Sequence, residues 1–213
     1  MTNPAYYEAV VLLLSEIQRS QAEATARAAD RIFSSLVAGG VLHIFGSGHS
    51  HSVAEEAFHR AGGLVPVNTM TEPFLSPLMS PKKSGRLERL SGLAAILLDY
   101  HEPRPDEVLI IVSNAGINPV PVELALEAKK RELTVIAITS LRHAQAVASR
   151  HASGKRLFEV ADLVIDNYGE AGDGAITFPG LTAKVGPTSL VAGAFIVNSI
   201  VCGVVERFVT KGL

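Results

Sequence analysis

The alternation of apolar and polar positions divides the chain into helical and extended segments. Apolar residues recur at helical spacing, for example Val10, Leu13 and Ile17, and predict one long helix over about residues 5–36 that Gly39-Gly40 ends. Short apolar runs bounded by glycine or polar residues predict strands at 41–45, 64–67, 107–112, 133–138 and 161–166. Helical patterns lie between and after them, at about 51–61, 86–100, 121–131 and 187–210.

Strands that alternate with helices indicate right-handed βαβ units and an α/β fold, with a mainly parallel sheet covered on both faces. The segment 69–84 interrupts this order with Pro73, Pro77 and Pro81, and we predict a long irregular loop there. We expect a single domain over residues 1–213, with the N-terminal helix at 1–38 and the α/β core at 40–213. Ligands of such sheets bind at the carboxyl ends of the strands.

The composition limits the kind of ligand site that the chain can build. Hydrophobic residues make up 47% of the chain and charged residues 19%, so a packed core is expected. The formal charge of −2 gives no overall attraction to nucleic acid or to an acidic membrane surface, and we expect neither as a partner. An anion site must then be local, built from backbone N–H groups and hydroxyls.

Two apolar stretches bear on the compartment of the protein. The N-terminal run follows no basic residue and comes directly after Glu8, which argues against a signal peptide. The stretch from Leu190 to Val205 is interrupted by Asn198 and is shorter than the roughly 20 residues that span a bilayer. We therefore predict a soluble, cytoplasmic protein. Cys202, the only cysteine, has apolar neighbours in this stretch and is predicted to be a core residue rather than a nucleophile.

The first predicted strand enters a turn of small and polar residues, Gly46-Ser47-Gly48-His49-Ser50-His51-Ser52. Glycines such as Gly48 let the backbone approach an anion closely, and the N–H groups that begin the following helix are unpaired. His49 lies at the mouth of the turn, and Ser50 and Ser52 add hydroxyl donors. The turn is neither a Walker A loop nor a complete dinucleotide fingerprint, so a purely structural turn remains an alternative.

A second turn of the same kind follows the strand at 107–112, with the sequence Ser113-Asn114-Ala115-Gly116-Ile117-Asn118. Polar residues, Thr139 and Ser140, also end the strand after it. The carboxyl ends of parallel strands lie at one edge of the sheet, so two such turns on neighbouring strands can surround one phosphate. No lysine is needed for this arrangement, which suits the weakly charged composition.

Together these motifs resemble the SIS (sugar isomerase) domain family, with G-x-G-x-S at 46–50, the stretch 113–123 and V-I-A-I-T-S at 135–140. The block E-E-A-F-H-R-A-G-G at 55–63 is similar to a UPF0309-like subgroup of stand-alone bacterial SIS proteins. The resemblance implies a three-layer αβα sandwich, with a flavodoxin-like, five-stranded parallel sheet and long terminal helices. It also implies a homodimer or homotetramer that binds a sugar phosphate near the subunit interface.

The resemblance carries Ser50, Ser113 and Asn118 over as phosphate contacts, together with backbone N–H groups of both turns, including the one at Gly116. The sequence departs from the family at one position, because the usual second serine is Ala115 here. We expect the missing hydroxyl to be replaced by Asn114 or Ser52.

SIS enzymes begin by removing a proton next to the carbonyl of the opened sugar, and a carboxylate in a partly dry pocket suits this step. Residues four apart share a helix face, which pairs Glu56 with Arg60 and Glu55 with His59 on the predicted helix. In several SIS enzymes the pocket-facing positions of this helix fall six and ten residues after the turn serine, which here are Glu56 and Arg60. The resemblance therefore implies Glu56 as the base, with Arg60 to orient it or to bind a substrate oxygen; a solvated ion pair is the alternative. Related etherases and isomerases carry glutamate or lysine at the second position, and Arg60 departs from that pattern. Glu55 and His59 form either a second catalytic pair or an interface contact.

Further candidates lie outside this helix. Lys184, before the last helix, is placed to stabilise an enolate or to protonate a leaving oxygen, unless it is a surface lysine. Glu72 is a reserve acid or base, and Asp173 is expected to hold the loop after the last strand. His49 and His51 with nearby glutamates admit a zinc site, but we expect no metal and no cofactor.

The leading hypothesis is an enzyme of carbohydrate metabolism that acts on a hexose or N-acetylhexosamine 6-phosphate. The reaction is aldose–ketose isomerisation or β-elimination by a lyase or dehydratase. The alternative is a non-catalytic sugar-phosphate sensor. SIS-domain regulators usually carry a helix-turn-helix, for which we see neither room nor a basic patch in this sequence.

Overall fold

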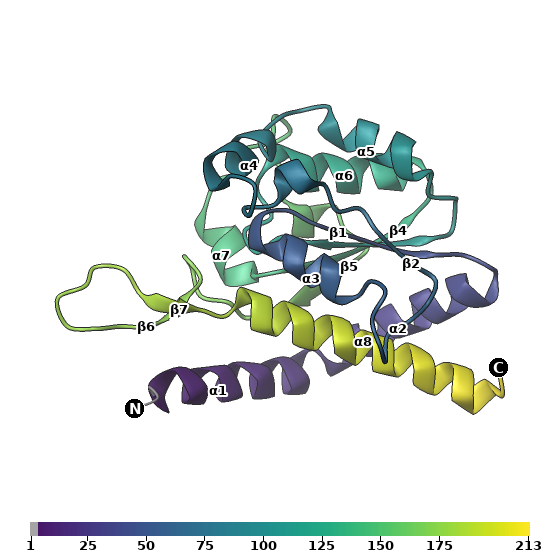
Figure 1. Ribbon diagram of the computed structural model, residues 1–213, viewed down its shortest axis with the longest axis horizontal. Coiled ribbons are helices and arrows are strands. Elements are labelled where there is room, and N and C mark those ends of the chain that lie inside the picture. The colour runs from purple at the N-terminus through teal and green to yellow at the C-terminus, as the bar shows by residue number, and fades with distance from the viewer. Residues whose placement is uncertain (1–3) are drawn as a thin grey trace.

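The computed structural model describes residues 4–213 and begins with two helices rather than one (Figure 1). α1 (Pro4–Ser20) and α2 (Ala22–Val37) separate at Gln21, so the prediction of one unbroken helix is wrong. The Gln21 side chain accepts a hydrogen bond from the Asp166 backbone N–H at 3.0 Å and donates one to the Tyr168 hydroxyl at 3.4 Å. Contacts with a distant part of the chain accompany the break, and the local pattern gives no sign of it.

Five parallel strands form the central sheet in the order β2-β1-β3-β4-β5, and the predicted five-stranded fold is confirmed. The register pairs Leu42 with Val67 on one side and with Val108 on the other. β2 lies later than the predicted 64–67, and Val65 is 94% exposed outside the sheet. The strands are β1 (Leu42–Gly46), β2 (Val67–Thr69), β3 (Val108–Val112), β4 (Thr134–Thr139) and β5 (Leu163–Asp166).

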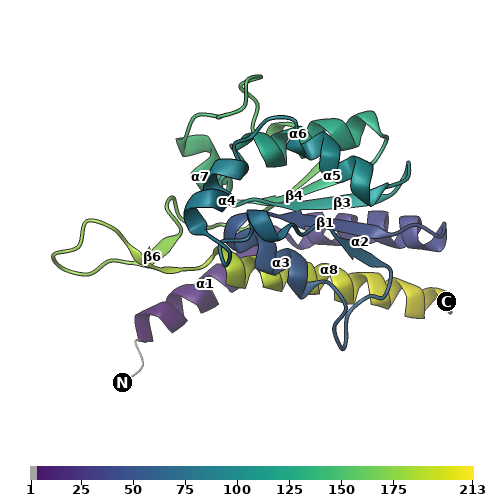
Figure 2. The same cartoon turned by 45° about the horizontal axis from the view of Figure 1, so that its top comes forward.

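Helices cover both faces of the sheet and give the three-layer arrangement visible in Figures 1 and 2. Alternate strand residues point to opposite faces, so Ile44 and Phe45 belong to two separate apolar clusters. One cluster lies beneath α2, α3 (His51–Glu56) and α8 (Ser189–Lys211). The other lies beneath α5 (Leu93–His101) and α6 (Pro119–Lys130).

The segment predicted as an irregular loop at 69–84 contains regular structure. It forms the short 3₁₀ helix η2 (Pro73–Leu75) and the helix α4 (Pro81–Leu87), both of which begin at a proline. Proline is favoured in the first turn of a helix because its missing N–H would be unpaired there anyway, and this is why the prediction is wrong. The helix predicted at 86–100 is also divided. α4 ends at Leu87, and Gly92, whose φ of +88° is not helical, directly precedes α5.

Three short elements escape the sequence pattern. They are α7 (Leu141–Ala146), the 3₁₀ helix η3 (Leu157–Glu159) and a hairpin of β6 (Gly174–Ile176) with β7 (Val185–Pro187). The hairpin projects from the body of the molecule beside α1 (Figure 1). The Tyr6 hydroxyl donates to the Pro187 carbonyl at 2.8 Å and so connects α1 to the hairpin.

Asp173, at the base of the hairpin, connects it to the start of α8. Its Oδ1 accepts the backbone N–H groups of Thr188 and Ser189 at 3.1 and 2.8 Å. Its Oδ2 accepts the Ser189 hydroxyl at 2.6 Å. The prediction that Asp173 holds the loop after the last strand is confirmed, and the carboxylate also caps the helix.

α8 is 23 residues long and has the length and apolar composition of a helix able to cross a membrane, a property that core helices share. The prediction that this apolar stretch is too short to span a bilayer is therefore wrong. The burial of Ile196 and Ile200 in the cluster with α2 agrees with a core helix instead.

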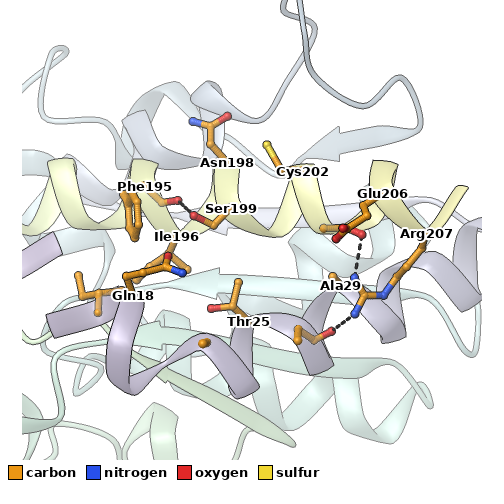
Figure 3. Close-up of a pocket in the computed structure, with 14 residues that line it drawn as sticks. Gln18, Thr25, Ala29, Phe195, Ile196, Asn198, Ser199, Cys202, Glu206 and Arg207 are labelled. Atoms are coloured by element: carbon orange, nitrogen blue, oxygen red, sulfur yellow. Dashed lines mark hydrogen bonds between the residues drawn. The ribbon is translucent and has the colours of Figure 1, made fainter. Parts of the chain in front are cut away.

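The prediction that Cys202 is a core residue is wrong, because its side of α8 is exposed. Val201 and Val204 face the core, whereas Cys202 and Asn198 project from the outer side (Figure 3). Cys202 borders a groove of about 720 Å³ between α2 and α8. Apolar neighbours in sequence do not bury a helical residue when they lie on another face of the helix.

A polar network is buried at the amino half of the sheet. Glu107 Oε2 accepts His43 Nε2 and the Arg104 backbone N–H, each at 2.8 Å. Asn68 Nδ2 lies 3.0 Å from His43 Nδ1 and 3.2 Å from His101 Nδ1. Burial favours a higher pKa for Glu107, but the hydrogen bonds from Arg104 and His43 outweigh it and lower the pKa. Burial, aided by His43, lowers the pKa of His101.

Candidate functional site

The first turn folds back so tightly that one position must be glycine. A Cβ on Gly46, the last residue of β1, would lie 2.1 Å from the Ser50 carbonyl oxygen. After it, Gly48 adopts φ +59° and starts the 3₁₀ turn η1 (Gly48–Ser50). The buried Ser47 hydroxyl donates to Glu88 Oε1 at 2.8 Å, which fixes the turn against the end of α4. Ser47 is therefore structural, and Ser50 is the hydroxyl that this turn offers.

Ser50 is placed at the start of α3 without capping it. Its side chain makes no hydrogen bond to the helix, so the hydroxyl stays available to a ligand. His49 and Ser52 are both exposed beside it. The structure thus places the predicted phosphate contacts of the first turn together at the carboxyl edge of β1.

The second turn orients its serine through its own backbone. Ser113 is buried after β3, and its Oγ accepts the Gly116 N–H at 3.2 Å, which leaves the hydroxyl proton free to donate. Gly116 has φ +60°, and a Cβ there would lie 3.1 Å from Leu157 Cβ. Because β1 and β3 are adjacent, this turn lies next to the first one.

Two amides of the second turn have different surroundings. Asn114 Oδ1 accepts Asn167 Nδ2 at 3.0 Å, which ties this side chain to the segment after β5. Asn118 stands at the start of α6 without capping it, and its Oδ1 accepts Arg150 Nη1 at 2.8 Å. Sequence reasoning missed Arg150, which lies 32 residues after Asn118 in a segment without a regular pattern.

Thr139 and Ser140, at the end of β4, support the second turn and the segment after β5 instead of offering donors to a ligand. The Thr139 hydroxyl donates to the Asn114 carbonyl at 3.2 Å. The Ser140 hydroxyl donates to the Gly169 carbonyl at 2.6 Å and accepts the His143 N–H at 3.0 Å. Both hydroxyl protons are already used inside the protein.

The helix after the first turn is shorter than predicted, and this changes the catalytic pairs. α3 ends at Glu56, and His59 has φ +46°, so the predicted helical pairing of Glu55 with His59 is wrong. Glu55 Oε1 lies instead 3.4 Å from His51 Nδ1. Glu56 and Arg60 do form the predicted ion pair, although Arg60 follows the end of the helix. Glu56 also accepts Asn198 Nδ2 from α8 at 3.1 Å.

A second carboxylate, Glu72, lies near the first turn on the loop after β2. Burial raises the pKa of Glu72, and the charge of His51 opposes this only in part. The His51 ring is itself buried, and its Nε2 has no hydrogen-bond partner in the described part of the chain. The pKa of the Glu72 carboxylate thus responds to the charge of His51, a buried imidazole at the start of α3 with an unused nitrogen.

Lys184 stands directly before β7, on the hairpin. It pairs with Glu170 at 3.2 Å, and Glu170 also pairs with Arg142.

Within residues 4–213, no three His, Cys, Asp or Glu side chains gather as metal ligands would. His49 and His51 differ in exposure, one outside and one buried. Their arrangement gives no support to the zinc alternative.

A parallel α/β sheet with two small-residue turns at adjacent strand ends defines the class of phosphate-binding α/β domains. The SIS domain model matches residues 5–140, and the chain belongs to the SIS-domain family. Within it, the chain is 41% identical over 208 residues to a UPF0309 protein of Shouchella clausii, covering 97% of this chain and 85% of that protein. The predicted family and subgroup are confirmed.

Solved structures share the fold at low sequence identity. A phosphoheptose isomerase from Francisella tularensis has a TM-score of 0.64 and 18% identity, covering 97% of this chain and 100% of that one. The Vibrio vulnificus NanR protein complexed with ManNAc-6P has a TM-score of 0.62 and 16% identity, covering 98% and 64%. The sugar isomerase domain of an RpiR transcription factor from Sphaerobacter thermophilus has a TM-score of 0.54 and 18% identity, covering 96% and 90%.

Proposed function

We propose that the protein binds a hexose or N-acetylhexosamine 6-phosphate and catalyses proton abstraction next to its carbonyl. The observation that carries the proposal is the pair of adjacent turns with uncommitted hydroxyls, Ser50 and Ser113. Backbone N–H groups of both turns complete a phosphate site that needs little net charge. The solved structures that share the fold include a phosphoheptose isomerase and a complex with ManNAc-6P, which supports a sugar phosphate as the ligand.

Two carboxylates compete for the role of the base. The family resemblance favours Glu56, but Arg60 and Asn198 occupy its oxygens. The Glu72 carboxylate has no ion-pair or hydrogen-bond partner in the described part of the chain, and burial raises its pKa, which favours a role in proton transfer. Because the oxygens of Glu56 are paired and those of Glu72 are not, Glu72 is the better supported base, with Glu56 and Arg60 as an orienting pair.

The enolate formed by the base has two outcomes that conserve atoms. In isomerisation, the proton returns to the neighbouring carbon and the carbonyl moves from C1 to C2. In β-elimination, the electron pair expels the C3 substituent and an unsaturated sugar remains. We propose that Lys184, on the projecting hairpin, serves the site of a second subunit, and the exposed side chains of Leu12 and Val209 on α1 and α8 support such a homo-oligomer.

A non-catalytic sugar-phosphate sensor is the second candidate. The RpiR transcription factor domain of the same fold supports it. In a sensor, the Glu56–Arg60 ion pair would have only a structural role. Either way, the ligand is a doubly charged ester that does not cross bilayers, which supports a cytoplasmic location.

The decisive experiment incubates the protein with a panel of hexose and N-acetylhexosamine 6-phosphates in deuterated water. Deuterium at C2 or a new ketose indicates isomerisation, and an unsaturated sugar indicates elimination. Glu72→Gln should abolish exchange and leave phosphate affinity nearly unchanged, with Glu127→Gln on the far surface as a matched control. A bound sugar that never exchanges would refute the enzyme and favour the sensor.

A further inference from the structure

Arg150 reaches the second turn from a part of the chain that the phosphate motifs do not include. Its backbone N–H donates to the Ile117 carbonyl at 2.9 Å, and its Nη1 donates to Asn118 Oδ1 at 2.8 Å. The side chain is exposed, and in the described part of the chain no carboxylate pairs with it. A guanidinium has five N–H donors, so most of those on Arg150 remain unused.

The segment that presents Arg150 is held by its own hydrogen bonds. The Ser149 hydroxyl donates to the Lys155 carbonyl at 2.7 Å, and Arg156 Nε donates to the Val147 carbonyl at 3.1 Å. His151, the next residue, lies 3.6 Å from Glu123 of α6, and both side chains are largely buried. The guanidinium is therefore placed beside the turn before any ligand arrives, which reduces the entropy lost on binding.

The contact with Asn118 also determines which end of that amide a ligand meets. Its Oδ1 is occupied by Arg150, so its Nδ2 is the end left to donate. Asn118 and Arg150 thus present adjacent N–H donors of the kind that a phosphate oxygen accepts. By contrast, two other arginines, Arg60 and Arg142, are paired with carboxylates, Glu56 and Glu170 respectively.

We infer that Arg150 is a phosphate-recognition residue, which supplies the positive charge that the serine turns lack and orients Asn118 toward the ligand. The inference rests on the proposed sugar-phosphate site. A charge-assisted hydrogen bond is about twice as strong as a neutral one, so Arg150 should separate phosphate esters from neutral sugars. It should also make their affinity depend on ionic strength.

The test measures the affinity of the full chain for inorganic phosphate and for glucose 6-phosphate by calorimetry at low and high salt. Arg150→Ala should weaken both about tenfold to a hundredfold and flatten the salt dependence. Arg150→Gln keeps a donor for Asn118 without the charge and should lose nearly as much, whereas Arg150→Lys should keep part of the affinity. Arg31→Ala, an exposed arginine beside the amino end of β4, is the matched control and should change nothing.

The outcomes separate this inference from the proposed function. If the wild type binds phosphate esters and Arg150→Ala binds them equally well, the inference is wrong and the site stands. If Arg150→Gln retains full affinity and salt dependence, the charge has no role. If the wild type binds neither probe, the proposed phosphate site itself is refuted, and this inference with it.

Discussion

Glu107 offers the sharpest test of how the polar network supports the sheet, because one buried carboxylate serves four donors. Besides His43 Nε2 and the Arg104 N–H, it accepts the Val41 N–H at 3.1 Å and Arg104 Nε at 2.9 Å. Its side chain is only 5% exposed, so water cannot replace a lost acceptor. Glu107→Ala would leave these donors without partners between β1 and β3.

The expected cost follows from these contacts. An unsatisfied buried donor costs about 1–3 kcal/mol, and Glu107→Ala leaves the Val41 N–H, the Arg104 N–H and His43 Nε2 without their acceptor. The Arg104 side chain is 62% exposed and regains water, so its share is small. We expect Glu107→Ala to lower the free energy of unfolding by about 3–5 kcal/mol, a fall in Tm of roughly 6–20 °C for a chain of this size.

Urea titration followed by circular dichroism measures this loss as a shift of the midpoint at constant slope. Glu127→Ala, which removes a surface pair with Lys130, is the control and should cost less than about 1 kcal/mol. The pKa of Glu107 is lower in the folded chain than its ordinary value of 4.5, so its contribution is present above that value. It is lost as the pH falls through the folded pKa, and the gap between wild type and Glu107→Ala should close there. A loss below about 1 kcal/mol at pH 7 would refute this account of the network.

Three further predictions concern the turns, the hairpin and α8. Gly46→Ala should destabilise the fold by about 1–3 kcal/mol and abolish phosphate binding, because its Cβ would clash with the Ser50 carbonyl; unchanged calorimetry would contradict the turn geometry. Gly186→Ala, with φ +78° and a Cβ 2.8 Å from the Tyr6 ring, should loosen the hairpin and speed its proteolysis, and equal cleavage rates would argue against this contact. Cys202 is the only thiol, so maleimide should label the native protein fully; labelling only after unfolding would show that another surface covers α8.

The sheet and its two turns were predictable because their signals are local. The residues of β1 and β3 are buried on both faces and read as continuous apolar runs, and small polar residues follow each run. The helix breaks were not predictable in the same way. Gln21 and His59 carry no strong local breaker, and the first is held by contacts with the region of β5.

The site residues show the same division between local and distant information. Ser50 and Ser113 follow from their position after a strand, whereas Arg150 reaches Asn118 only because the segment after α7 folds back over the turn. The exposure of Cys202 depends on which side of α8 meets α2. Neither the spacing of residues along the sequence nor the alternation of apolar residues predicts the Arg150–Asn118 contact or the exposure of Cys202.

The two ends of the sheet have different roles, and this division makes the proposals separable. At the amino half, Glu107, His43 and Asn68 satisfy one another and leave little for a ligand. At the carboxyl edge, Ser50 and Ser113 retain hydroxyl protons that no protein acceptor uses. These free hydroxyls are the donors on which the proposed phosphate site depends, whereas the carboxylate of Glu107 is fully used inside the protein. Variants at the amino half should therefore change stability and not affinity, and Arg150 variants should do the opposite.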